Sequence, residues 1–573
     1  MGTPQHQQSA TMPVLKLIVL GITLYTLNYL RKLHTNYKLA RSTHLNVVIS
    51  PLDPYGMIWQ LTQPLLNSYM RLLPERLSLW FKVMDMGWSW ELDDYVHRKL
   101  GSSFVVVSAE RNVIYTCDKE AVQWVLGRRK DFLKPDVYEA LDIFGRNVDT
   151  VNGDDWSRHR KLTAPCFNER VSSLVWDESL RQGRSMLSHW LSQGKISDMV
   201  DDTRTLALHV LSAAGFGVSH DFLEGNAKPA EGHLMSHRDA LTTILRNLVT
   251  SIVLSQMPWA KRVVPKKLKD VCLAISEFRL YMDELLASER EVMRKEKGFS
   301  KPNLISTLIR TSDEAKAEGV QSAVRLTDEE IKGNIFIFNL AGHDTTANSL
   351  AYALTLLALH PEIQAWVVEE VDEVMREENS EYESLYPRLK RVQAVLYETL
   401  RLYGPVPNVP RAVSGPNKTL QLTCSSSSPS STYTLSIPPN TSLNLSLHAA
   451  HTNAAYYPDP TSFKPSRWIK STSSPSSLQT EELLPQPPSF NPWSSGPRIC
   501  PGMKFAQVEF AAVLAILLHS ARVSPALRKD GHGPEYEERA RKEVYGVMRD
   551  SALNGPTLSM NRPEDLWLKI AKR

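Results

Sequence analysis

The cysteine at position 500 stands among residues that suit a metal-bound thiolate. The segment is Asn491-Pro-Trp-Ser-Ser-Gly-Pro-Arg-Ile-Cys-Pro-Gly502. A thiolate is a soft, strongly donating ligand, and its charge must be held away from water. Gly496 permits a turn whose backbone N–H groups can point at the sulfur, and Gly502 removes a side chain where the next element begins. We therefore predict that Cys500 is a thiolate ligand to iron.

The residues after Cys500 predict a helix from Met503 to about His519. Apolar side chains recur there at helical spacing: Phe505, Val508, Phe510, Val513, Ile516 and Leu517. Cys500 would then lie at a helix N-terminus, where the helix dipole favours an anion. Arg498 could pair with a haem propionate, so haem is the expected cofactor. The alternative is a buried free thiol beside a Pro-Gly turn.

A second motif, Ala341-Gly-His-Asp-Thr-Thr346, lies within a predicted helix that ends near Leu359. The helix opens with Thr327-Asp-Glu-Glu330, a capping box. Glycine costs about 1 kcal/mol relative to alanine inside a helix, and a buried aspartate needs a partner. The motif therefore indicates a functional site, although a helix kinked by Ser/Thr back-bonding is the alternative.

Two further motifs pair an arginine with another residue on one helix face. Glu398 and Arg401 are three residues apart in an apolar segment, and Arg467 in Phe463-Lys-Pro-Ser-Arg467 offers a third member of a buried cluster. Trp156 and Arg160 are one turn apart, so an indole N–H and a guanidinium could reach the same anionic group.

In their order along the chain, the four motifs resemble those of the cytochrome P450 superfamily, over roughly residue 45 to the C-terminus. Trp493 is a departure, because the family usually has Phe at that place in the cysteine loop. The resemblance implies the cytochrome P450 fold and a haem b cofactor, iron protoporphyrin IX, with Cys500 as axial ligand.

The resemblance also assigns roles to individual residues. It places Ala341 and Gly342 over the iron, where small residues leave room for O2. Asp344 and Thr345 become the catalytic pair that supplies protons. The expected haem-binding residues are Trp156, Arg160, Arg411, Trp493, Gly496, Arg498 and Gly502. Glu398, Arg401 and Arg467 receive a structural role behind the haem pocket.

The expected fold class is mostly α with a minor β-sheet, in one catalytic domain over residues 56–573. Long helical patterns run from Leu326 to Leu359, Pro361 to Met375 and Leu389 to Leu402, with strand-like pieces at Phe104–Val107 and Thr441–Leu445. The five cysteines contain no Cys-x-x-Cys pair, which argues against a zinc site or a disulfide framework.

An apolar stretch, Val14–Leu30, predicts a single N-terminal transmembrane anchor, because it is about as long as the shortest spanning helix. Arg31 and Lys32 follow directly, so the positive-inside rule places the catalytic body in the cytosol and residues 1–13 in the lumen. Residues 31–55 are expected to form a basic, proline-containing linker. The resemblance implies the endoplasmic reticulum membrane. A cleaved signal peptide is the competing interpretation.

The formal net charge of +4 comes without a basic stripe interleaved with aromatic residues, so we expect no nucleic-acid partner. The family resemblance implies NADPH-cytochrome P450 reductase as the electron donor, with O2, an apolar small molecule and membrane lipid as the other partners. The serine-rich stretches 424–431 and 471–477 are expected to be surface loops.

The sequence therefore predicts a membrane-anchored haem-thiolate monooxygenase that hydroxylates or epoxidises an apolar small molecule. The amino-acid sequence of the cysteine loop resembles that of filamentous-fungal family members, many of which act on secondary metabolites. The segment Phe132–Thr150 is expected to cover an apolar pocket. The alternatives are a family isomerase or dehydratase that does not use O2, and a haem-binding protein without turnover.

Overall fold

The structure is a computed structural model. It describes residues 11–70, 72–85, 87–223, 229–256, 265–295, 303–317, 325–376, 381–416, 418–423, 432–471, 478–554 and 557–573. The chain forms two compact units, one from residues 1–133 and 407–456 and the other from residues 134–406 and 457–573. The single catalytic domain that we predicted over residues 56–573 includes parts of both units and stays a prediction. The predicted serine-rich loops at 424–431 and 472–477 lie outside the described residues.

The first unit is built on a mixed six-stranded sheet with strand order β1-β2-β3-β9-β6-β4. Its strands are β1 (Asn46–Ile49), β2 (Ser103–Val107), β3 (Asn112–Thr116), β4 (Phe132–Leu133), β6 (Asn408–Val413) and β9 (Thr441–Ser446). A separate hairpin joins β7 (Thr419–Thr423) and β8 (Thr432–Ser436). The predicted strands at 104–107 and 441–445 are confirmed. The first is an apolar run rich in β-branched valine, and the second alternates leucine with polar residues.

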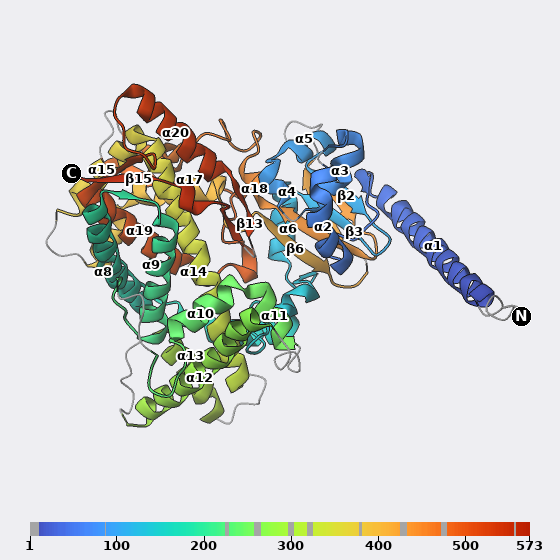
Figure 1. Ribbon diagram of the computed structural model, residues 1–573, viewed down its shortest axis with the longest axis horizontal. Coiled ribbons are helices and arrows are strands. Elements are labelled where there is room, and N and C mark those ends of the chain that lie inside the picture. Colours follow the sequence, from blue (N-terminus) through green and yellow to red (C-terminus); the bar gives the residue numbers. More distant parts are fainter. Residues whose placement is uncertain are drawn as a thin grey trace, which may run out of the picture. The chain divides into compact units, whose positions relative to one another are not determined.

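Helices flank this sheet within the same unit (Figure 1). They are α1 (Thr11–Arg41), α2 (Met57–Met70), α3 (Glu75–Met84), α4 (Trp88–Glu91), α5 (Tyr95–Leu100), α6 (Lys119–Gly127) and α18 (Leu447–His451). Residues 31–55 are more ordered than the linker we predicted. α1 continues to Arg41 because its basic residues are good helix formers, and β1 pairs in parallel with β2 before Pro51 and Pro54 break the chain.

The second unit is mostly helical. Its helices are α7 (Gly153–Thr163), α8 (Glu169–Gln193), α9 (Met199–Phe216), α10 (His237–Arg246), α11 (Leu248–Gln256), α12 (Lys266–Lys295), α13 (Leu304–Ala317), α14 (Asp328–Leu359), α15 (Pro361–Val374), α16 (Tyr382–Leu385), α17 (Lys390–Leu402), α19 (Met503–Ser520) and α20 (Pro534–Arg549). Its strands are β5 (Lys195–Ile196), β10 (Ile469–Ser471), β11 (Glu481–Leu483), β12 (Ala521–Pro525), β13 (Ser551–Asn554), β14 (Thr557–Met560) and β15 (Leu568–Lys572).

The predicted helices α14, α15, α17 and α19 are present within one or two residues of their expected bounds. α14 begins with the predicted capping box, in which the Thr327 hydroxyl accepts the Glu330 backbone N–H. α8 and α9 pack against α19 and α14 and enclose the core. Among the described residues, one helix is long and apolar enough to cross a membrane, α19, and it is mostly buried in this core.

Candidate functional site

The cysteine loop is shaped by two left-handed residues and one backbone hydrogen bond. Ser494 and Gly496 have φ values of 63° and 68°, the second of which glycine adopts without strain. A short 3-10 turn, Gly496–Arg498, then leads to Cys500, whose backbone N–H donates to the Trp493 carbonyl at 2.9 Å. Gly502 is the N-cap residue of α19. The loop therefore presents Cys500 just before the N-terminus of a long buried helix.

The surroundings of the Cys500 sulfur shift the pKa of its thiol in opposite directions. Burial raises the pKa of the Cys500 thiol, while the Gly502 backbone N–H and the Arg160 guanidinium oppose the rise. Taking a sulfur anion out of water is costly unless a cation compensates for it. A bound metal ion would supply that compensation, so the environment suits a metal thiolate better than a free thiol.

Arg160 and Arg498 bring α7 to the cysteine loop. The Arg498 guanidinium lies 4.9 Å from the centre of the Trp156 ring and donates to the Val151 carbonyl and to Asn152 Oδ1, both at 2.8 Å. Burial lowers the pKa of Arg160, and the Cys500 sulfur opposes that shift. The guanidinium group of Arg160 makes no hydrogen bond or ion pair with any described residue. A half-buried cation of this kind fits an anionic cofactor group such as a propionate.

Phe167 connects the cysteine loop with α14. Its ring meets the Phe338 ring edge-on, with 5.3 Å between the ring centres. On its other side, a Cβ atom built on Gly502 would lie 3.8 Å from Phe167 Cε1. Phe338 is three residues before Ala341, so this aromatic contact fixes the second motif relative to Cys500.

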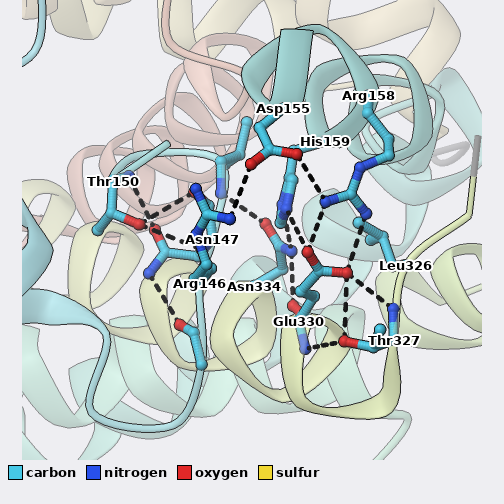
Figure 2. A network of polar contacts seen from close by, with 12 residues as sticks. Arg146, Asn147, Thr150, Asp155, Arg158, His159, Leu326, Thr327, Glu330 and Asn334 are labelled. Carbon is cyan, nitrogen blue, oxygen red and sulfur yellow. Dashed lines mark hydrogen bonds and ion pairs between the residues drawn. The ribbon is translucent and has the colours of Figure 1, made fainter. Parts of the chain in front are cut away.

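A polar network ties the opposite side of α7 to the first turns of α14 (Figure 2). Arg158 donates to both oxygens of Glu330, at 2.9 and 2.5 Å. The fully buried His159 contacts Asn334 at 3.0 Å, and the Asn334 side-chain oxygen accepts the Val148 backbone N–H at 2.9 Å. α7 is therefore held to the cysteine loop on one side and to α14 on the other.

The loop before α7 lies directly on the same turns of α14. A Cβ atom on Gly145 would meet the Glu329 carbonyl oxygen at 2.1 Å, and one on Gly333 would meet the Gly145 carbonyl oxygen at 2.3 Å. Phe144 is fully buried against Phe278 and Phe336. We predicted that the segment Phe132–Thr150, which includes Phe144, covers an apolar pocket. The Phe144 ring is part of the core between α12 and α14.

In the middle of α14, the second motif interrupts the buried length of the helix. Residues on both sides of the motif are buried, whereas Ala341 is exposed and Gly342 to Thr345 are half-buried. The Thr345 hydroxyl donates to the Ala341 carbonyl at 2.8 Å, which is the back-bonding considered as an alternative from the sequence. A side chain at Gly342 would lie 3.3 Å from Leu211 of α9. Close packing against α9 is therefore one reason for glycine here, and its expected place over the cofactor stays a prediction.

Asp344 is held from two sides by residues that the sequence did not indicate. Arg204 Nε of α9 lies 3.2 Å from Asp344 Oδ1, and the Thr557 hydroxyl of β14 donates to Oδ2 at 2.9 Å. Burial lowers the pKa of the neighbouring His343 to about 4. Arg204 and Thr557 are 140 and 213 residues from Asp344 in the sequence, so no local pattern could have pointed to them.

Glu398 is the centre of a saturated buried cluster. Arg401 donates to both of its oxygens at 2.9 Å, and Arg467 Nε donates to Oε1 at 3.0 Å. The Lys464 backbone N–H and the Trp468 indole N–H occupy the remaining positions, at 2.9 and 3.0 Å. The structure thus brings together the three predicted residues, and Glu398 and Arg401 are fully buried.

Trp493 and Arg411 complete the set of predicted residues. The Trp493 ring meets Tyr397 edge-on, 6.0 Å away, and its indole N–H makes no hydrogen bond within the described part of the chain. Arg411 is buried in β6 of the first unit, where it donates to the Pro410 carbonyl at 2.9 Å. Its predicted contact with haem stays a prediction.

Comparison with known proteins agrees with a fold and a cysteine loop of this kind. The family model for cytochrome P450 matches residues 73–538. A cytochrome P450 monooxygenase of Penicillium roqueforti, ORF6, is 30% identical over 90% of this chain and 92% of its own. The phomenoic acid biosynthesis cluster cytochrome P450 monooxygenase of Leptosphaeria maculans is 30% identical over 96% of this chain and 99% of its own.

A solved structure has the same fold. The crystal structure of a cytochrome P450, CYP102L1, aligns with a TM-score of 0.61 at 20% identity and covers 85% of this chain and 95% of that one. The chain belongs to the cytochrome P450 family, with the mostly α-helical fold of that family, and its relatives are haem monooxygenases.

Proposed function

We propose that this protein is a membrane-anchored monooxygenase that oxidises an apolar small molecule at a haem b group held by Cys500. The observation that carries the proposal is the half-buried Cys500 just before α19, with the unpaired Arg160 guanidinium close enough to influence the charge of its sulfur. Haem, when bound, supplies O2 activation, so that one oxygen atom enters the substrate and the other leaves as water with two electrons and two protons.

The residues of the chain divide the remaining tasks. Cys500 would bind the haem iron, and the Gly496 turn and Gly502 shape its loop. Trp156, Arg160 and Arg498 would bind the haem carboxylates. Ala341 keeps the helix surface small beside the substrate, and the Trp493 ring packs near the sulfur. Glu398, Arg401 and Arg467 support the loop from behind, since a buried ion cluster with all its hydrogen bonds made holds its backbone segments in fixed positions.

Asp344 and Thr345 handle protons. The Asp344 carboxylate is partly exposed and contacts Arg204, so it can exchange protons with solvent. The adjacent Thr345 hydroxyl can receive a proton from that side and pass it into the pocket, because a hydroxyl both donates and accepts. Retention of this acid and alcohol favours O2 chemistry over the isomerase or dehydratase alternative.

The membrane anchor and the electron donor belong to the same proposal. The predicted anchor, Val14–Leu30, lies within α1, and its side chains Leu17, Ile22, Leu24 and Leu27 are all more than half exposed. A lipid bilayer would cover such a surface. We place the body on the cytosolic face of the endoplasmic reticulum and assign NADPH-cytochrome P450 reductase as the donor. The Leptosphaeria relative supports a role in secondary metabolism.

Incubation of the purified protein with haem, reductase, NADPH and extracts of its host under ¹⁸O2 tests the proposal. We expect a product heavier than its precursor by one labelled oxygen atom. Isomerisation or dehydration without consumption of O2 would favour the alternative class of family members. Binding of haem without NADPH consumption or product would favour a carrier.

A further inference from the structure

One face of α14 is joined to the C-terminal hairpin β13–β14 by hydrogen bonds at successive helical turns. Asp344, Asn348 and Tyr352 are spaced by four residues and therefore lie on the same side of the helix. Asp344 accepts from Thr557, Asn348 Nδ2 donates to the Leu558 carbonyl at 3.2 Å, and the Tyr352 hydroxyl donates to Ser551 Oγ at 2.8 Å. The catalytic acid is thus the first member of a polar row that binds the hairpin.

The hairpin is a firm support for this contact. Thr557 is 3% exposed, and the backbone N–H of the next residue, Leu558, donates to the Pro405 carbonyl at 2.8 Å. Pairing of Asn554 with Thr557 and of Ser551 with Met560 sets the hairpin register. A hydroxyl on such a support has few ways to move.

The geometry fixes the direction of the Thr557 hydrogen bond. The Asn348 amide approaches Thr557 Oγ1 as a donor at 3.5 Å, so the hydroxyl hydrogen is free to point to Asp344. Oδ1 of the carboxylate is engaged by Arg204, and Oδ2 receives this hydrogen. With both oxygens held from different elements, the carboxylate has one defined rotamer.

We propose that Thr557 is a positioning residue for Asp344, and that its hydroxyl holds the carboxylate in the orientation from which protons enter the site. The proposal rests on the proposed function of Asp344. Without the hydroxyl, Arg204 alone would hold the carboxylate, which could then turn towards α9 and leave its present orientation.

The contact itself can be measured without catalysis. In a double-mutant cycle of Asp344→Ala and Thr557→Val, we expect each single change to lower the denaturant midpoint of unfolding. The double variant should lose clearly less than the sum of the two, because the second change removes a hydrogen bond that is already absent. Additive effects would overturn the contact, whatever the reaction of the protein.

Its effect on proton delivery can be measured without knowing the substrate, through NADPH oxidation with reductase and O2 and no organic substrate. We expect Thr557→Val to slow this rate by about tenfold or more, the order of one lost hydrogen bond to a charged group, with an increased solvent isotope effect. Thr557→Ser should restore the rate to within about twofold of the wild type, because it restores the donor.

The matched control is Tyr352→Phe, which removes a hydroxyl from the same interface two helical turns away from Asp344 and leaves Asp344 untouched. We expect its NADPH oxidation rate to stay near that of the wild type. The proposal is overturned if Thr557→Val is as fast as the wild type or faster, if Thr557→Ser is as slow as Thr557→Val, or if Tyr352→Phe reproduces the loss. A wild-type protein that consumes no NADPH would contradict the proposed function instead, and the unfolding cycle would still decide the contact.

Discussion

At the scale of single residues, Trp493 is the place where the cysteine loop departs from the family pattern, which usually has Phe there. An indole carries an N–H donor that Phe lacks, and a hydrogen bond to the thiolate would withdraw charge and raise the haem potential. The ring instead packs edge-on against Tyr397, and its N–H has no hydrogen-bond partner among the described residues. The larger ring therefore fills space beside the loop.

We accordingly expect Trp493→Phe to leave the ferric/ferrous potential of the haem-loaded protein unchanged. The measurement is a spectroscopic redox titration of both proteins, with haem content as the control for folding. A shift to a more negative potential at equal haem content would mean that the indole donates to the sulfur after all.

The sequence motifs indicated candidate site residues, but they did not indicate the distant residues that contact them. Cys500, Glu398 and Arg401 lie in motifs with local spacing, and the structure gives each of them contacts that its motif implied. Arg204 and Thr557 could not be predicted, because they reach Asp344 only through tertiary packing. The contact of Gly342 with Leu211 was not predictable for a related reason, since a sequence does not show what an absent side chain would have met.

At the scale of elements, the Glu398 cluster joins α17 to the segment around Arg467. We expect Glu398→Gln to lower the free energy of unfolding by about 3 kcal/mol, because two arginines would lose the charge that compensates them in a buried site. Chemical denaturation with haem content as a second readout measures this. The control Glu543→Gln removes one partner of an exposed pair with Arg539 and should cost less than about 1 kcal/mol. Equal losses in the two variants would show that the cluster is not a special support.

The network between α7 and α14 predicts a dependence on pH. Burial alone would raise the pKa of Glu330, but hydrogen bonds from Arg158, His159 and the Thr327 backbone outweigh it and hold this pKa below its ordinary value. The ionised carboxylate therefore stabilises the folded state above the unfolded pKa, about 4.3. Its contribution is lost as the pH falls from there towards the lower folded-state pKa.

The free energy of unfolding should accordingly differ most between the wild type and Glu330→Gln near pH 7. Below about pH 4.3, this difference should shrink by up to about 1.4 kcal/mol per pH unit. Denaturation curves of both proteins from pH 7 to acid give the result. Glu291→Gln, at an exposed pair with Lys295, should show a small difference throughout. A difference for Glu330→Gln that is constant with pH would contradict the assigned ionisation.

At the scale of the whole molecule, the periodic signals in the sequence predicted the long helices, since amphipathic spacing and capping boxes are local. The division into two units was not visible, because β6 and β9 of the first unit lie far along the chain from β2 and β3, and β9 joins that sheet through a parallel pairing with β3. Only the folded chain brings such distant strands together.

The topology of the chain can be tested through its N-glycosylation sequons. Asn440 is exposed at the turn before β9, whereas Asn444 is buried against Tyr55 and Asn417 lies outside the described residues. Asn440 is therefore the informative site. We expect the protein from a eukaryotic host to carry no glycan there, because a cytosolic body does not meet the glycosylation machinery. A glycopeptide containing Asn440 in the mass spectrum would invert the proposed topology.

The central claim is that the Cys500 thiolate is the iron ligand of a haem enzyme, and the spectrum of the reduced carbon monoxide complex tests it most directly. We predict that the haem-loaded wild type shows the strongly red-shifted Soret band of a thiolate ligand. Cys500→Ser should lose that band, because a serine hydroxyl is a poor ligand to iron at neutral pH. A Cys500→Ser protein that binds haem and keeps the red-shifted band would contradict the account.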